Sequence, residues 1–222
     1  PTLQSFLAKK ISYQQALPAV FAQLDAGLKK HPYAQYGGAT AAVVAIESGV
    51  AHIAWAGDSR VIIARGDGSI KAHTIDHVWT KESEVDRATA KGATITQRPG
   101  GSPRVVGYEP SRAFGDFAGK VASNGAIISD PELGYVPLAV GDIIVIACDG
   151  VFEFDSRTRR ETLTNQEVID LVNSDGIVGT QFEARKDHGS AGKLATAAKR
   201  IRDKAYEKES ADNISVIVIK VQ

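Results

Sequence analysis

The sequence predicts an α+β fold with two antiparallel sheets flanked by helices, and two observations lead to this prediction. First, short apolar segments separated by Gly, Asp and Ser turns follow one another through residues 39–74, which leaves no room for the crossovers that parallel strands need. Second, helical periodicity occurs in separate runs instead of alternating with strands. Because the 222 residues contain no linker or repeat, we expect a single domain over residues 1–222.

The composition limits the classes of partner and compartment. The 26 basic residues balance 26 acidic ones, so we expect no nucleic-acid partner. No apolar run approaches the roughly 20 residues that a membrane-spanning helix needs. The single cysteine, Cys148, excludes an internal disulfide and favours a reducing compartment. We therefore expect an intracellular protein, cytoplasmic or nuclear, that acts as a monomer.

The first third of the chain predicts helices and then a run of strands. Apolar residues recur at three- and four-residue steps within residues 2–30, which predicts helix, and Pro32 and the Gly37-Gly38 pair end it. Short turns then separate four apolar, partly β-branched segments, which we expect to pair as an antiparallel meander. These strands are predicted at 39–46, 50–56, 60–64 and 69–74.

The remaining elements are predicted from turn residues and capping signals. A polar helix is expected at 81–91, and three prolines and three glycines within residues 97–110 indicate a loop in a flap region at 77–110. Thr164 and Glu167 have the spacing of a capping box, which predicts the start of a helix. The other elements are a strand at 141–148, a loop at 175–190, a helix at 191–207 and a strand at 214–221.

Three aspartates occupy equivalent places beside predicted strands. Asp58 and Asp149 follow apolar strands, and Asp212 precedes one. Clustered carboxylates repel each other, by roughly 4 kcal/mol for a pair about 4 Å apart at an effective dielectric constant near 20, so such a cluster needs a cation. Oxygen ligands favour Mg²⁺ or Mn²⁺ over zinc. Each aspartate alone can equally be a turn residue or a helix cap, so spacing does not establish that the three converge.

Seven short motifs occur in order along the chain. They are Gly38-Ala39-Thr40-Ala41, Ala56-Gly57-Asp58-Ser59-Arg60, Asp76-His77 with Glu84, Ser111-Arg112-Ala113-Phe114-Gly115-Asp116 with Lys120, Asp130-Pro131-Glu132, Ala147-Cys148-Asp149-Gly150 and Asp212-Asn213-Ile214-Ser215. Together they resemble the protein phosphatase 2C family, the metal-dependent serine/threonine phosphatases, over nearly the whole chain. One such motif would be weak evidence, whereas seven in order are specific.

This resemblance implies a four-layer α-β-β-α sandwich and a centre with two Mg²⁺ or Mn²⁺ ions and a third, more weakly held one. Asp149 and Asp212 would be ligands of the two ions, and Asp58 a ligand of the third. Gly150 and Glu153 would be accessory residues at this centre. The implied activity is hydrolysis of phosphoserine and phosphothreonine in signalling phosphoproteins by metal-activated water.

The chain departs from the family pattern in three respects, one of which is that Gly107-Tyr108-Glu109-Pro110 replaces the family's apolar segment before Ser111-Arg112. Glu153 stands where the family usually has Asp, which moves the carboxylate one methylene outward. The family's Asp-Gly-His-Gly-Gly motif and an earlier phosphate-binding Arg do not occur, so the sequence itself contains no catalytic residue to assign. Because the chain opens at Pro1 and contains no Met, we expect them upstream. The alternative function is a catalytically inactive, phosphatase-like scaffold or regulatory protein that binds a partner.

Three further residues lie within matched motifs. Arg112 and Asp116 could clamp phosphate or take part in an internal ion pair, and we favour the ion pair because structural ion-pair networks imitate functional sites. The sequence assigns no physical role to His77.

Overall fold

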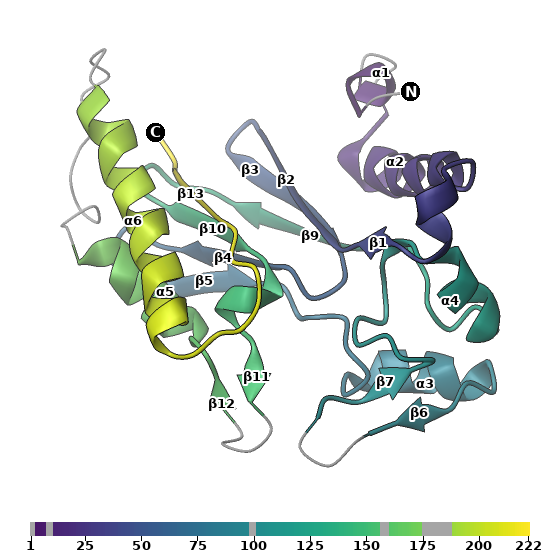
Figure 1. Cartoon of the computed structure of the whole chain (residues 1–222). Coiled ribbons are helices and arrows are strands. Elements are labelled where there is room, and N and C mark those ends of the chain that lie inside the picture. The colour runs from purple at the N-terminus through teal and green to yellow at the C-terminus, as the bar shows by residue number, and fades with distance from the viewer. Residues whose placement is uncertain (1–2, 8–10, 98–100, 156–159, 175–187) are drawn as a thin grey trace. The chain divides into compact units, whose positions relative to one another are not determined.

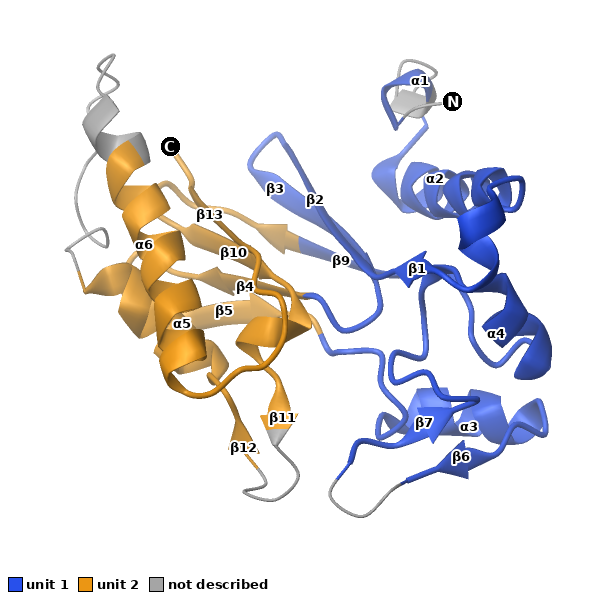
Figure 2. Ribbon diagram, in the orientation of Figure 1, with its two compact units in different colours: residues 1–59, 75–135 blue, residues 60–74, 136–222 orange. Residues whose placement is uncertain are grey.

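The computed structural model describes residues 3–7, 11–97, 101–155, 160–174 and 188–222. The chain divides into two compact units that interleave in the sequence (Figure 2). One unit comprises residues 1–59 and 75–135, and the other comprises residues 60–74 and 136–222. Each unit is described by itself, and the single domain over residues 1–222 stays a prediction.

The first unit contains the N-terminal helices and a three-stranded sheet, of whose last strand residues 136–137 belong to the second unit (Figure 1). The strand order is β2 (Ala41–Glu47), β3 (Val50–Ala56) and β9 (Glu132–Pro137). Helices α1 (Leu3–Leu7) and α2 (Tyr13–Leu28) precede this sheet. Helix α2 packs against β3 because its apolar stripe meets small residues on the strand. The buried residues of this contact are Leu17, Phe21, Ala54, Ala56 and Phe114.

The first unit also holds the predicted flap region. It contains α3 (Glu82–Ala90) and the short pair β6 (Ile95–Thr96) and β7 (Arg104–Val105). Trp79, Ala88 and Ile127 belong to its own small core. The remaining elements of this unit are η1 (Pro32–Gln35), β1 (Gly38–Ala39), β8 (Phe114–Gly115), which pairs with β1, and α4 (Phe117–Ala122).

The second unit contains a four-stranded antiparallel sheet covered by two helices (Figure 1). The strand order is β13 (Val216–Lys220), β10 (Ile143–Ala147), β4 (Arg60–Ala64) and β5 (Ile70–His73). Helix α6 (His188–Glu207) lies along β13. The other elements are η2 (Asp149–Val151), β11 (Phe154–Asp155), β12 (Arg160–Glu161) and α5 (Asn165–Asn173). The core between sheet and helices includes Ile62, Ile143, Val145, Ile169 and Ile201.

The predicted capping box is present at the start of α5. The Thr164 hydroxyl accepts a hydrogen bond from the Glu167 N–H at 3.2 Å, and the Glu167 carboxylate accepts one from the Thr164 N–H at 2.8 Å. These bonds satisfy two N–H groups that lack partners within the helix itself. The following loop was predicted at 175–190, but residues 175–187 lie outside the described residues.

The predicted meander is wrong as one continuous sheet. β2 pairs with β3 and β4 pairs with β5, but β3 and β4 belong to different sheets. The chain leaves the first sheet after Ala56, and Arg60 already pairs with Ala147 of the second. Short turns between strands therefore do not guarantee that successive strands pair.

The sequence signals do not predict β9, α4 or the two-residue strands β6, β7, β8, β11 and β12. β9 and α4 are each only 6 residues long, so neither shows an extended hydrophobic period. No helix among the described residues combines the length and the apolarity that crossing a membrane requires.

Candidate metal centre

The structure brings the turns that carry Asp149 and Asp212 together within the second unit. Ala147, at the end of β10, pairs with Val216 at the start of β13. Beyond this pair, the Cys148 N–H donates to the Ser215 carbonyl at 3.2 Å, and the Cys148 thiol donates to the Asn213 carbonyl at 3.1 Å. The two acidic turns therefore adjoin, because they extend the same pair of antiparallel strands.

Gly150 permits this close approach. A Cβ atom at residue 150 would lie 2.3 Å from the Asn213 carbonyl oxygen, far inside van der Waals contact. The Ser210 hydroxyl donates to the Gly150 carbonyl at 2.7 Å, which ties the two turns together from the other side. Residue 150 is thus restricted to glycine by backbone proximity.

The carboxylates in these turns are suitable donors for a hard divalent cation. Both Asp149 and Asp212 are exposed. Asp149 Oδ1 accepts from the Gly150 N–H at 3.0 Å, and Asp212 Oδ1 accepts from the Asn213 N–H at 2.6 Å. Each of these bonds fixes the carboxylate through one oxygen. Two oriented carboxylates on touching turns fit Mg²⁺ or Mn²⁺ and offer no sulfur or imidazole ligand for zinc.

Glu153 contacts the loop that carries Asp212. Its Oε2 accepts from the Ala211 N–H at 3.1 Å and lies 3.3 Å from the Ser210 hydroxyl. The longer side chain of Glu, compared with the Asp usual in the family, is thus used here to hold residues 210–211.

Asp58 lies in the first unit, on a buried turn directly after β3. The preceding residue, Gly57, has a positive φ of 110°, and a Cβ atom there would lie 2.2 Å from the Thr40 side chain. The hydroxyls of Thr40 and Ser59 share a hydrogen bond of 2.8 Å. His77 holds the same turn: the Gly57 N–H donates to its Nδ1 at 3.1 Å, and its own N–H donates to the Gly57 carbonyl at 3.0 Å.

A second group of potential ligands escaped the sequence analysis. His77, Glu84 and Glu132, all in the first unit, place one potential ligand atom each within 4.8 Å of one another. All three residues belong to the seven motifs described above, so the sequence did contain a signal for this group. Their partners, however, are cations: Arg87 and Arg112 bind Glu84, and Lys81 and Arg112 bind Glu132.

The electrostatics of this group disfavour a metal ion. Burial raises the pKa of Glu84, but hydrogen bonds from Arg87, Arg112 and Ser111 outweigh burial and hold its pKa far below the ordinary value. Because the His77 Nδ1 accepts a hydrogen bond, the proton of the neutral ring lies on Nε2, which then has no lone pair for a metal. The negative charges of the two carboxylates are already balanced by three cationic side chains. No net negative charge therefore remains to attract a metal ion.

Arg112 and Asp116 do not pair with each other. Arg112 Nη2 lies 2.7 Å from Glu84 Oε1, so its ion-pair partners are the carboxylates of this buried network. Asp116 sits in the left-handed region at φ 49°, where burial raises the pKa of its carboxyl group and Tyr108 is its hydrogen-bond partner.

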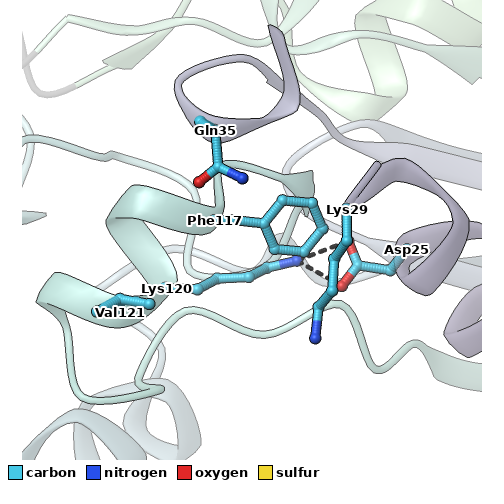
Figure 3. A pocket seen from close by; sticks show the side chains of 6 residues that line it. All are labelled: Asp25, Lys29, Gln35, Phe117, Lys120 and Val121. Atoms are coloured by element: carbon cyan, nitrogen blue, oxygen red, sulfur yellow. Dashed lines mark hydrogen bonds and ion pairs between the residues drawn. The ribbon is translucent and has the colours of Figure 1, made fainter. Parts of the chain in front are cut away.

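A shallow depression lies between α2 and α4 (Figure 3). Lys120 Nζ lies 2.7 and 2.8 Å from the two oxygens of Asp25, an ion pair that joins the two helices across it. The depression has a volume of about 490 Å³ and is lined by Asp25, Lys29, Gln35, Phe117, Lys120 and Val121.

Comparison with known proteins identifies close similarity over most of the chain. A family model described as "Protein phosphatase 2C" matches residues 2–214. The curated rice protein "Probable protein phosphatase 2C 44" (Oryza sativa subsp. japonica) is 31% identical over 187 residues, which cover 83% of this chain and 49% of that protein. The chain spans about half the length of the curated relatives it matches.

Solved structures show the same likeness. A phosphatase from a pathogenic strain of Toxoplasma gondii is 27% identical with a TM-score of 0.62, covering 78% of this chain and 48% of that one. A sex determining protein of C. elegans is 26% identical with a TM-score of 0.67, covering 92% of this chain and 45% of that one. These matches confirm the predicted fold class, an α+β sandwich.

Proposed function

The chain belongs to the protein phosphatase 2C family, and we propose that the protein is a Mg²⁺- or Mn²⁺-dependent phosphatase that hydrolyses phosphoserine and phosphothreonine in proteins. One observation carries the proposal beyond family membership. The turns of Asp149 and Asp212, 63 residues apart in sequence, adjoin so closely that only glycine fits at residue 150. Two exposed carboxylates on adjoining turns are suitable ligands for a hard divalent cation.

Each residue of the centre has a defined part in this proposal. Asp149 and Asp212 bind the divalent ions, and the absence of a side chain at Gly150 keeps their turns in contact. Asp58 is a ligand of a further, more weakly held ion. When bound, such ions neutralise charge on the phosphoryl oxygens and lower the pKa of the attacking water. The substrates are phosphorylated proteins.

A second candidate function is a catalytically inactive scaffold that binds a partner. The observation that favours it is Glu153, whose carboxylate is occupied by Ala211 and Ser210 at 3.1 and 3.3 Å. Because both contacts involve Oε2, only Oε1 of this carboxylate is left for a third ion. The two functions differ in one measurable property, because only the enzyme turns over a phosphate ester.

The proposal is tested by hydrolysis of p-nitrophenyl phosphate by the full-length protein, with and without Mn²⁺. We expect Mn²⁺-dependent turnover that falls by at least about 100-fold in Asp149→Asn, because this change removes charge at the ion while conserving shape. Asp203→Asn is the matched control, since Asp203 is exposed on α6 and pairs only with its neighbour Arg202 among the described residues.

The possible outcomes separate the two functions. Turnover that needs no metal, or that survives unchanged in Asp149→Asn, contradicts the proposed centre. A well-folded protein that binds Mn²⁺ in calorimetry but hydrolyses neither p-nitrophenyl phosphate nor a phosphothreonine peptide is the scaffold.

A further inference from the structure

The side chain and the backbone of His77 each make one hydrogen bond to the backbone of Gly57. The Gly57 N–H donates to the side-chain Nδ1 at 3.1 Å, and the backbone N–H of His77 donates to the Gly57 carbonyl at 3.0 Å. Residues 57 and 77 are 20 apart in sequence, so these bonds fix one turn onto another. Because both polar groups of Gly57 are engaged, His77 determines the backbone path immediately before Asp58.

The turn at Gly57 cannot hold this shape through side chains of its own. Gly57 has φ 110°, a conformation that residues with a Cβ rarely adopt, and glycine by itself is the most flexible residue. The contact of Thr40 with Ser59 fixes only the far side of the turn. The imidazole of His77 therefore supplies the rigidity that the glycine lacks.

Surrounding groups hold the imidazole in one orientation and one tautomer. His77 is fully buried, and its ring stacks parallel to Trp55 with the ring centres 5.8 Å apart. The Trp55 indole donates to the Ile75 carbonyl at 2.9 Å, which fixes the segment that leads to His77. Nε2 lies 3.5 Å from Glu132 Oε1 without a hydrogen bond between them, and Lys81 and Arg112 hold that carboxylate in place.

We propose that His77 is the positioning residue for Asp58: its Nδ1, which accepts from the Gly57 N–H while the ring stacks on Trp55, fixes the Gly57–Ser59 turn so that Asp58 meets its ion in one orientation. This inference rests on the proposed function, in which Asp58 is a ligand of the weakly held ion. It predicts that His77 affects the metal dependence of the enzyme through Asp58.

The structural part of the proposal is tested without metal or substrate. In ¹⁵N NMR spectra of the metal-free protein, we expect the His77 ring to be protonated at Nε2 and unprotonated at Nδ1. In His77→Phe, which keeps a ring to stack on Trp55 but removes the acceptor, we expect a large shift of the Gly57 amide resonance. A ring protonated at Nδ1, or an unmoved Gly57 amide, overturns the proposal.

The functional part is tested by titrating Mn²⁺ against hydrolysis of p-nitrophenyl phosphate. We expect the Mn²⁺ concentration for half-maximal activity to rise about tenfold in His77→Phe, as for other residues that orient a metal ligand. His77→Asn, whose amide oxygen can replace Nδ1, is expected to show a smaller rise. His52→Phe is the matched control, because His52 also stacks on an aromatic ring, that of Tyr13 at 4.2 Å.

A double variant distinguishes positioning from general structural support. If His77 acts through Asp58, then His77→Phe adds nothing to the altered metal dependence of Asp58→Asn. Additive effects, or unchanged metal dependence in both His77 variants, overturn the inference. Wild-type protein without any Mn²⁺-dependent turnover instead refutes the proposed function, whatever the NMR spectra show.

Discussion

At the residue scale, the network around His77 shows how buried charges decide the state of a neighbouring group. Burial, together with the charges of Arg112 and Lys81, lowers the pKa of His77 from 6.5 to about 4, against the opposite effect of Glu84 and Glu132. Protonation would also place an Nδ1–H against the Gly57 N–H, which already occupies that position. The ring is therefore neutral at physiological pH, in agreement with its role as a hydrogen-bond acceptor.

The neutral state of the buried His77 ring predicts that the free energy of unfolding depends on pH. Because the pKa of His77 is lower in the folded protein than in the unfolded chain, the unfolded chain binds the proton first as the pH falls. The contribution of His77 to stability is thus complete above pH 6.5 and is lost as the pH falls towards 4. We expect a loss of roughly 2 kcal/mol in the free energy of unfolding between pH 7 and pH 5.

The measurement is urea denaturation of the wild type, His77→Phe and His52→Phe at both pH values. His77→Phe should lose most of the slope with pH, whereas His52→Phe should keep it. An equal slope in all three proteins would assign the pH dependence to other groups.

At the scale of the element, local sequence signals predict the boundary of an element where side chains of that same element form its cap. Helix α5 begins at Thr164 and Glu167, which bond to each other's backbone, so three residues of separation are enough to predict its start. The sheets follow a different rule. β3 and β4 are separated by only three residues, yet they lie in different sheets, where each pairs with one neighbour in the sequence and one distant strand, β9 or β10.

The cap of α5 provides a stability prediction. Thr164→Ala removes the hydroxyl that accepts the Glu167 N–H and is expected to cost about 1 kcal/mol. Thr196→Ala is the matched control, since the Thr196 hydroxyl donates to the Gly192 carbonyl within α6, a bond that adds little to a helix. Urea denaturation measures both. A control that loses as much as Thr164→Ala would show that the cap is not responsible.

At the scale of the whole molecule, the proposed metal centre would couple ion binding to folding. Asp149 and Asp212 become neighbours only when β10 and β13 pair, so the unfolded chain has no comparable site. A ligand that binds only the folded state stabilises the fold by mass action. Ion binding should therefore stabilise the strands from which both turns extend.

This coupling is measurable by calorimetry of thermal unfolding. With Mn²⁺ at about 100 times its dissociation constant, we expect the free energy of unfolding to rise by about 2.7 kcal/mol, and a chelator to reverse the rise. Asp212→Asn should respond much less, and Asp203→Asn should respond as the wild type does. An equal response of all three proteins would place the ion elsewhere.

The sequence by itself determined the α+β class, the longer strands other than β9, most helices, the cap of α5 and, through seven ordered motifs, the family. These properties depend on residues close together in the chain, where apolar spacing and turn chemistry act. Only the tertiary structure decided that the chain changes sheets after Ala56, that Gly150 meets Asn213, and that His77 holds Gly57. Such contacts depend on which faces pack together, and packing brings side chains into register across separations at which the sequence carries no periodic signal.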